Sequence, residues 1–156
     1  MGNPDWIIVR QALWAVLNIF YDRFTKNEKD VPLRMCMEMR IMGGSDILMA
    51  AQHGNKNGTC SIEVLTPQNL STDDWLSFCQ EVTNKWLSLS GSDGKPLNAR
   101  PHWAKQWNIG NNLKARDKQM EEYLTEDAYK DQIPKFGQQL INIGKDAETP
   151  FTMGSV

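Results

Sequence analysis

Residues 34–42, Arg-Met-Cys-Met-Glu-Met-Arg-Ile-Met, alternate large apolar side chains with polar or small ones. Successive side chains of an extended strand point to opposite faces, so this alternation predicts a β-strand with two unlike faces. The face typical of a protein core comprises Leu33, Met35, Met37, Met39 and Ile41. The opposite face comprises Arg34, Cys36, Glu38 and Arg40. A carboxylate and a guanidinium therefore lie side by side on that face, roughly 6.5–7 Å apart along the strand.

A second informative piece, residues 98–105, reads Asn-Ala-Arg-Pro-His-Trp-Ala-Lys. Its first part belongs to an irregular strand predicted over residues 97–103. On such a strand Trp103 points away from the face that carries His102, so we expect Trp103 to lie in the core.

The remaining pattern predicts helices and strands in an α+β arrangement. Helices are expected over residues 5–24, after Asn3 and Pro4, and over residues 71–89, with Ser71 as the N-cap. Further strands are expected over residues 46–52 and 59–66, and further helices over residues 113–125, 128–133 and 134–143. The predicted fold is an antiparallel sheet of about four strands, covered on one face by two amphipathic helices, with a helical C-terminal region. The first helix has only a narrow polar stripe, so most of its circumference should be covered.

Size and composition favour one domain over residues 1–156 and exclude several partners. The 17 basic and 19 acidic residues nearly balance and are scattered, which predicts no nucleic-acid partner. The apolar stretch 6–21 includes Arg10, Gln11 and Asn18, so it is too short and too polar for a membrane span. It also lacks the features of a secretory signal.

The cysteines and histidines predict neither disulfides nor a metal site. Cys36, Cys60 and Cys79 are odd in number and widely spaced, which favours a reducing compartment, the cytoplasm. The two histidines, His53 and His102, form no cluster with cysteines. We expect His53 to lie on the surface of a Gly/Asn-rich loop and Cys36 to be a small buried residue.

The charged face has a purely structural interpretation. A half-buried antiparallel strand often exposes one charged face, and Arg40 would then simply pair with Glu38. His102 would be a structural histidine, and Lys105 a solvated lysine.

The two pieces together resemble the C-terminal part of FAD-linked oxidases of the vanillyl-alcohol-oxidase type. The similarity is greatest to sugar-lactone (aldonolactone) and alditol oxidases, which carry a Glu-x-Arg strand followed by a His-Trp-(Gly/Ala)-Lys motif. The resemblance covers about residues 32–151. It implies that Glu38, Arg40 and Lys105 are catalytic, that His102 and Lys105 contact the cofactor, and that Glu63 and His102 face the substrate.

The resemblance implies an FAD-dependent oxidoreductase that oxidises a hydroxyl-bearing carbon. The substrate would be small and hydroxylated: a sugar lactone, a polyol, a sterol or another alcohol. No Gly-rich loop between a strand and a helix suits the FAD pyrophosphate. FAD would therefore be held mainly by a flavin-binding domain or subunit outside these residues, and the chain alone would be inactive. The alternative is a non-catalytic binding or structural module derived from the same fold.

Overall fold

A computed structural model of the chain describes residues 6–27, 31–32, 36–67, 72–105 and 113–146. The long helices are α1 (Trp6–Lys26), α2 (Thr72–Leu87) and α4 (Ile133–Asp146). A four-residue helix, α3 (Met120–Tyr123), continues into the π-helical turn η3 (Leu124–Ala128). The strands are β1 (Met37–Met42), β2 (Thr59–Val64), β3 (Lys114–Ala115) and β4 (Lys118–Gln119). The expected N-terminal caps, Asn3 and Ser71, lie outside the described residues, as do residues 33–35 of the predicted first strand.

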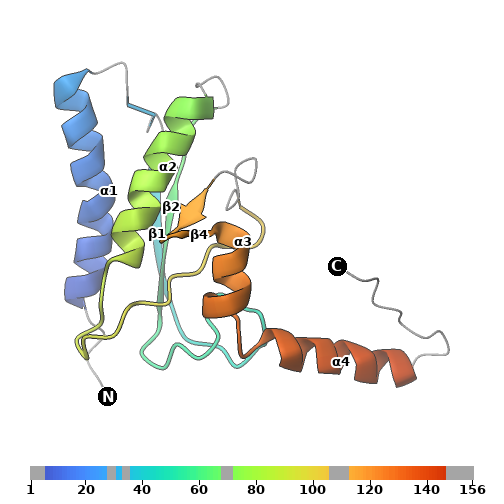
Figure 1. Cartoon of the computed structure of the whole chain (residues 1–156). Helices are drawn as coiled ribbons and strands as arrows, with labels where there is room; N and C mark the ends of the chain where they lie inside the picture. The colour runs from blue at the N-terminus through green and yellow to red at the C-terminus, as the bar shows by residue number, and fades with distance from the viewer. Residues whose placement is uncertain (1–5, 28–30, 33–35, 68–71, 106–112, 147–156) are drawn as a thin grey trace.

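The chain is α+β, as predicted, but its described strands form two separate two-stranded antiparallel sheets and not one sheet of four. β1 pairs with β2, and β3 pairs with β4. Figure 1 shows α1 and α2 running side by side, with β1 and β2 behind α2.

Two of the predicted strands, at residues 46–52 and 97–103, do not form. Residues 46–52 form successive turns, closed by hydrogen bonds from Ala50 N–H to the Ile47 carbonyl (3.3 Å) and from His53 N–H to the Ala50 carbonyl (3.0 Å). Met49 within them has φ 63°, which an extended strand excludes. Residues 97–103 run without strand pairing, apart from an isolated bridge just before them between Ser90 and Pro96.

One apolar cluster joins both long N-terminal helices to one face of the β1–β2 sheet. Its buried members are Val16, Ile19, Phe78 and Val82. Met37 of β1 and Val64 of β2 pack against it and are directly opposite each other in the register. The expected covering of one sheet face by two helices is therefore present at this end of the sheet.

The predicted core face of the first strand continues beyond that cluster but is not buried. Met39 keeps 45% of its surface exposed and Ile41 keeps 49%. The prediction that these two residues lie in the core is wrong for this chain, because the helices cover only the Met37–Val64 end.

A second apolar cluster lies around the C-terminal elements. Its members are Leu87, Leu113, Ala115, Met120, Tyr123, Leu124, Ala128 and Tyr129. The helix predicted over residues 113–125 is interrupted here, because the β3–β4 hairpin turns through Arg116, whose φ is 58°. This turn lets Leu113 and Met120 enter the same core from the two sides of the hairpin.

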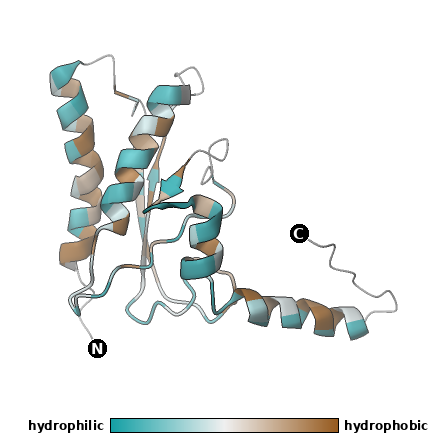
Figure 2. Ribbon diagram, in the orientation of Figure 1, coloured by the Kyte–Doolittle hydropathy of each residue, from teal (hydrophilic) through white to brown (hydrophobic). Residues whose placement is uncertain are grey.

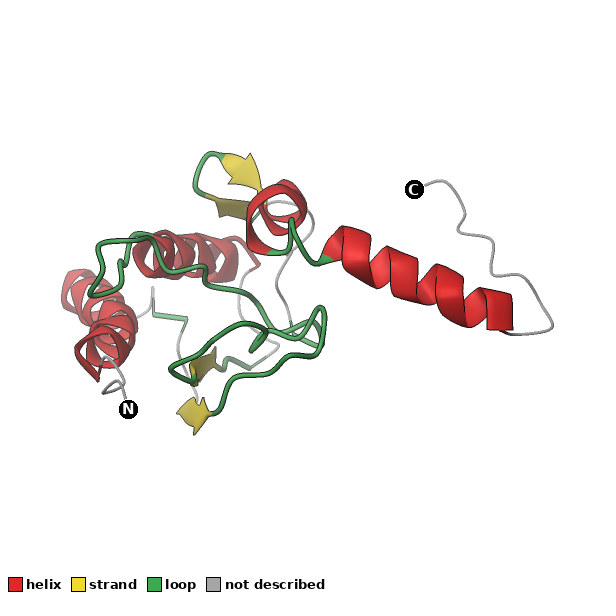
Figure 3. Cartoon of the chain, turned by 90° about the horizontal axis from the view of Figure 1, so that it is seen from below, coloured by secondary structure: helices red, strands yellow, loops and turns green. Residues whose placement is uncertain are grey.

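The two end helices expose much apolar surface. On α1 the exposed large apolar residues are Ile7, Trp14, Tyr21 and Phe24. The described structure therefore does not cover most of α1, contrary to expectation. α4 projects away from the rest of the chain (Figures 1 and 3), and Figure 2 shows hydrophobic residues along it. None of the described helices is both long and apolar enough to cross a membrane.

Candidate active site

The β1–β2 register places the predicted acidic residues of the two strands directly opposite each other. Glu38 is the partner of Glu63, and Arg40 is the partner of Ser61. Directly opposed residues share one face of an antiparallel pair, so Glu38, Arg40 and Glu63 lie on the same face. Two opposed carboxylates repel each other unless cations lie nearby. The structure supplies one cation for each carboxylate.

Arg40 forms the first ion pair, from its own strand. Its Nη2 lies 2.7 Å from Oε2 of Glu38. The side chains of Arg40 and Glu38 keep 66% and 43% of their surface exposed. An ion pair this exposed contributes only about 0–1 kcal/mol to the free energy of unfolding. The pair therefore adds little to the stability of the fold.

Lys105 forms the second ion pair, from a distant part of the sequence. Its Nζ lies 2.5 Å from Oε1 of Glu63, and the Glu63 side chain is only 21% exposed. The hydrogen bond from Lys105 lowers the pKa of Glu63 below its ordinary 4.5, against the opposing effect of desolvation. The positive charges of Lys105, Arg40 and His102 lower this pKa further. Glu63 is therefore ionised at neutral pH.

A tight turn holds His102 and Lys105 close to this face. The N–H of Lys105 donates to the carbonyl of His102 (2.9 Å), and the N–H of Ala104 donates to Nδ1 of His102 (3.1 Å). Nδ1 of His102 is thus the hydrogen-bond acceptor inside this turn. The structure thus brings Glu38, Arg40, Glu63, His102 and Lys105 together from three segments of the chain.

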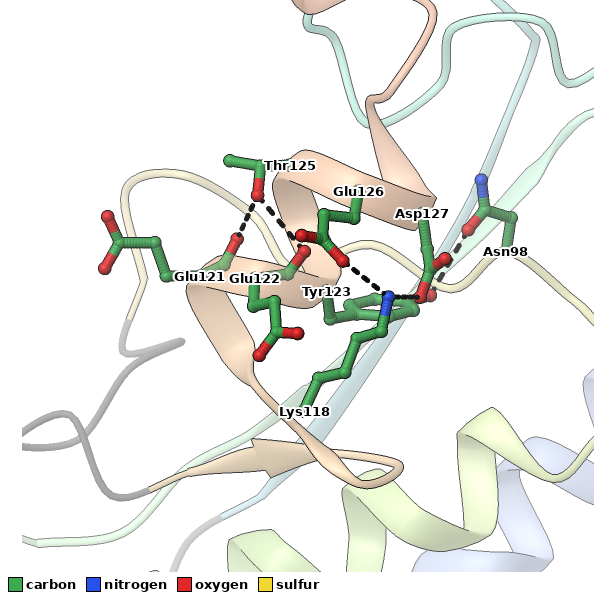
Figure 4. Close-up of polar contacts among 8 residues, drawn as sticks. All are labelled: Asn98, Lys118, Glu121, Glu122, Tyr123, Thr125, Glu126 and Asp127. Atoms are coloured by element: carbon green, nitrogen blue, oxygen red, sulfur yellow. Dashed lines mark hydrogen bonds and ion pairs between the residues drawn. The ribbon is translucent and has the colours of Figure 1, made fainter. Parts of the chain in front are cut away.

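The segment that carries this turn is held at its start by the C-terminal core. Nδ2 of Asn98 donates to the carbonyl of Ala128 (3.2 Å). The hydroxyl of Tyr123 lies 3.2 Å from Oδ1 of Asn98 and 2.9 Å from the carbonyl oxygen of Ala99. Figure 4 shows the contact of the Tyr123 hydroxyl with Asn98 and the ion pairs of Lys118, whose Nζ lies 2.9 Å from Glu126 and 3.3 Å from Asp127. These contacts fix the π-helical turn next to the segment.

Two sequence-based expectations for residues near the site, those for Trp103 and Cys36, are wrong, and the expectation of a surface position for His53 is met in part. Trp103 is 42% exposed and does not lie in the core, because residues 102–105 form a turn and not a strand. Cys36 is exposed and lies immediately before the start of β1. His53 is half-buried, because its loop folds back and its Nδ1 lies 3.1 Å from the carbonyl oxygen of Ile47.

Arg100 is a residue that sequence analysis left without a role. Its Nη1 donates to the carbonyl of His53 (2.8 Å), and its guanidinium lies 5.0 Å from the ring centroid of Tyr129. In the sequence, a role for Arg100 was indicated only by its position within the Arg-Pro-His-Trp-Ala-Lys piece. Only the tertiary contacts show what the side chain does.

The arrangement has the groups needed to accept a proton and to stabilise negative charge. Glu38 and Glu63 are potential proton acceptors, and Arg40 and Lys105 carry fixed positive charge. The described residues contain no group of three or more His, Cys, Asp or Glu side chains that could hold a metal ion.

Compared with the models of known protein families, with curated proteins and with solved structures, the chain gives no match.

Proposed function

We propose that this chain is the substrate-side part of an FAD-dependent oxidoreductase that oxidises a hydroxyl-bearing carbon. The observation that carries the proposal is the convergence of two carboxylates and two cations on one sheet face. Glu38 with Arg40, and Glu63 with Lys105, come from β1, β2 and the turn at residues 102–105. These are the residues for which the motif resemblance implies contact with flavin and substrate.

The chemistry divides between the carboxylates and the cations. Oxidation of an alcohol carbon requires a group that accepts the hydroxyl proton, and an ionised carboxylate at hydrogen-bond distance can do so. Lys105 favours the ionised form of Glu63, whose pKa it lowers, and Arg40 lies 2.7 Å from Glu38. After the proton has moved, the two cations stabilise the negative charge that develops at the site.

The described site residues could contact the flavin ring system of FAD, but the described residues offer no site for its pyrophosphate. Lys105, with His102 on the same turn, offers hydrogen-bond donors for the electron-rich ring system. The pyrophosphate needs backbone N–H groups at a Gly-rich strand-to-helix turn, and no described strand leads into a helix through such a turn. Bound FAD would supply the hydride acceptor, and a flavin-binding domain or subunit would hold most of it.

The uncovered apolar surfaces support a partner of that kind. Met39 and Ile41 are half-exposed on the apolar face of the sheet, and α1 exposes Trp14 and Tyr21. These surfaces lie on α1 and on the sheet face opposite to Glu38 and Glu63, so a flavin-binding partner could dock there while its flavin reaches the charged face. The small hydroxylated substrate, a sugar lactone, a polyol or another alcohol, would lie on the Glu38–Glu63 face.

One observation favours the alternative, a non-catalytic module. Each carboxylate already has a cation within 2.7 Å, so the charged face is satisfied without any ligand. A module with this face would bind a protein or a small molecule without chemistry.

Flavin reduction by substrate separates the two functions. In the enzyme reconstituted from this chain and its flavin-binding partner, we expect Glu38→Gln and Arg40→Met each to slow flavin reduction at least ~100-fold, because each removes charge that acts at the reacting atoms. Glu122→Gln and Arg116→Met, which change charges on exposed residues of the C-terminal elements, are the matched controls. Unchanged reduction rates in both site variants would exclude the proposed site.

The visible absorption of the chain mixed with FAD tests where the cofactor is held. We expect the chain alone to remain folded and colourless after removal of unbound FAD. A yellow protein would place the FAD-binding site within these residues and would contradict the proposed division between domains.

A further inference from the structure

The position of Lys105 depends on a segment without regular secondary structure. Residues 97–105 form neither helix nor strand, yet they bring Lys105 to within 2.5 Å of Glu63. A lysine side chain is long and flexible, so its ammonium group is well placed only if its backbone is held. Contacts made by residues 100 and 103 hold the turn at residues 102–105.

Trp103 makes two such contacts. Its indole Nε1–H donates to the carbonyl of Met49 (2.7 Å), in the loop between β1 and β2. Its ring lies 5.0 Å from the ring of Tyr129, centroid to centroid, at an interplanar angle of 31°. The ring contact and the hydrogen bond thus join the turn to two different parts of the chain.

Arg100 joins the same segment to the same two places. Its Nη1 donates to the carbonyl of His53 (2.8 Å), again in the loop between β1 and β2, and its guanidinium lies over Tyr129. Tyr129 is only 1% exposed, and burial raises the pKa of Tyr129 against the opposing charge of Arg100. The phenol therefore stays neutral, and the contact is a cation–π interaction.

The loop that receives both hydrogen bonds is itself fixed. The N–H of Met49 donates to Oε1 of Gln132 (2.8 Å), and Gln132 is buried. Ser45 and His53 form a bridge that closes the loop. With φ 63°, Met49 directs its N–H to Gln132 while its carbonyl receives Trp103.

We propose that Arg100 and Trp103 are positioning residues that hold the turn at residues 102–105 against the β1–β2 loop and Tyr129, so that Lys105 faces Glu63. This inference rests on the proposed function for its catalytic meaning, but its geometric content can be tested in the chain alone. Neither residue needs to touch substrate or cofactor.

The ionisation of Glu63 reports the position of Lys105. The groups that act on Glu63 are Lys105, Arg40 and His102, with the Glu38 carboxylate opposite on β1. Lys105 has the largest effect, so losing its contact raises the pKa of Glu63. A change confined to Trp103 or Arg100 leaves all four of these groups in the sequence. Any effect on Glu63 must then act through geometry.

The experiment is an NMR titration of the Glu63 carboxyl carbon in the 156-residue chain. Lys105→Met defines the pKa without the ion pair. We expect Trp103→Leu and Arg100→Met each to raise the Glu63 pKa over most of that difference. Trp103→Phe keeps an aromatic ring against Tyr129 but lacks the indole donor, so it should give an intermediate value and remain folded if the leucine variant does not.

Arg116→Met is the matched control. Its guanidinium also lies over a buried tyrosine, 5.6 Å from the ring of Tyr123, but it belongs to the β3–β4 hairpin. This variant should leave the Glu63 pKa at the wild-type value. A wild-type Glu63 pKa in folded Trp103→Phe and folded Arg100→Met would overturn the inference.

Flavin reduction by the reconstituted enzyme separates this inference from the proposed function. If both hold, Trp103→Phe and Arg100→Met slow flavin reduction by up to about 100-fold, as a misplacement near 1 Å can. A raised Glu63 pKa with unchanged flavin reduction would support the positioning role and contradict the proposed function.

Discussion

Glu63 shows most clearly how a single residue depends on its surroundings. The pattern of residues 59–66 predicts that it lies on a strand, and only the resemblance implies that it faces the substrate. In the structure its carboxylate is opposite Glu38, accepts a hydrogen bond from Lys105 and is ionised at neutral pH. The alternation of residues 34–42 predicted the shared face of Glu38 and Arg40 correctly. It contained no information about Lys105, because pairing across 42 positions depends on tertiary structure.

The lowered pKa of Glu63 has a consequence for stability in acid. A carboxyl group whose pKa is lower in the folded chain than in the unfolded chain contributes stability above its unfolded pKa. That contribution is lost as the pH falls from 4.5 through the lower folded value. We therefore expect wild type to be more stable than Glu63→Gln at pH 7, with the difference shrinking below pH 4.5.

Urea unfolding at a series of pH values measures this difference in the free energy of unfolding. Glu122→Gln, at an exposed carboxylate on α3, is the control for a general charge effect. A constant difference between wild type and Glu63→Gln from pH 7 to pH 3 would show that the ion pair with Lys105 does not lower the Glu63 pKa.

At the scale of elements, local pattern and tertiary contacts disagreed in the C-terminal half. Residues 113–125 have good helix formers, yet the chain turns back at Arg116 and forms the β3–β4 hairpin. Burial of Leu113, Ala115 and Met120 in one cluster outweighs the local preference for a helix. The same competition turned predicted strand 46–52 into a loop, whose Met49 N–H bonds to Gln132.

Gln132 should be the main side-chain anchor of that loop. Gln132→Ala leaves the Met49 N–H without its partner, so we expect a loss of about 1–3 kcal/mol in the free energy of unfolding. Gln138→Ala, on the exposed face of α4, is the control and should change stability by less than about 0.5 kcal/mol. Urea denaturation of both variants tests this. Equal stability of the two would exclude an anchoring role for Gln132.

At the scale of the whole molecule, the β1–β2 sheet has a covered end and an open end. Phe78 is 1% exposed in the cluster that covers Met37 and Val64, whereas Ile41 is 49% exposed at the open end. The same sheet face therefore belongs to the core at one end and to the surface at the other. α1 and α4 likewise leave apolar residues uncovered (Figure 2).

Thermal and urea unfolding should show a large loss of stability for a substitution at the covered end of the sheet and a small loss for one at the open end. Phe78→Ala should cost about 3–5 kcal/mol, because it leaves a cavity between the two helices and the sheet. Ile41→Ala should cost less than about 1 kcal/mol in the isolated chain, because much of its surface is already in water. A similar loss in both variants would mean that the open end of the sheet is buried in solution.

The sequence by itself determined the α+β class, the long N-terminal helix, the helix at residues 72–87 and the two faces of the first strand. Each follows from the period of apolar residues along a short segment, which needs no distant partner. The tertiary structure alone decided which strands pair, where the core ends and how Lys105 meets Glu63. These depend on contacts among segments far apart in the chain, such as Arg100 with His53 and Trp103 with Met49, which no local period encodes.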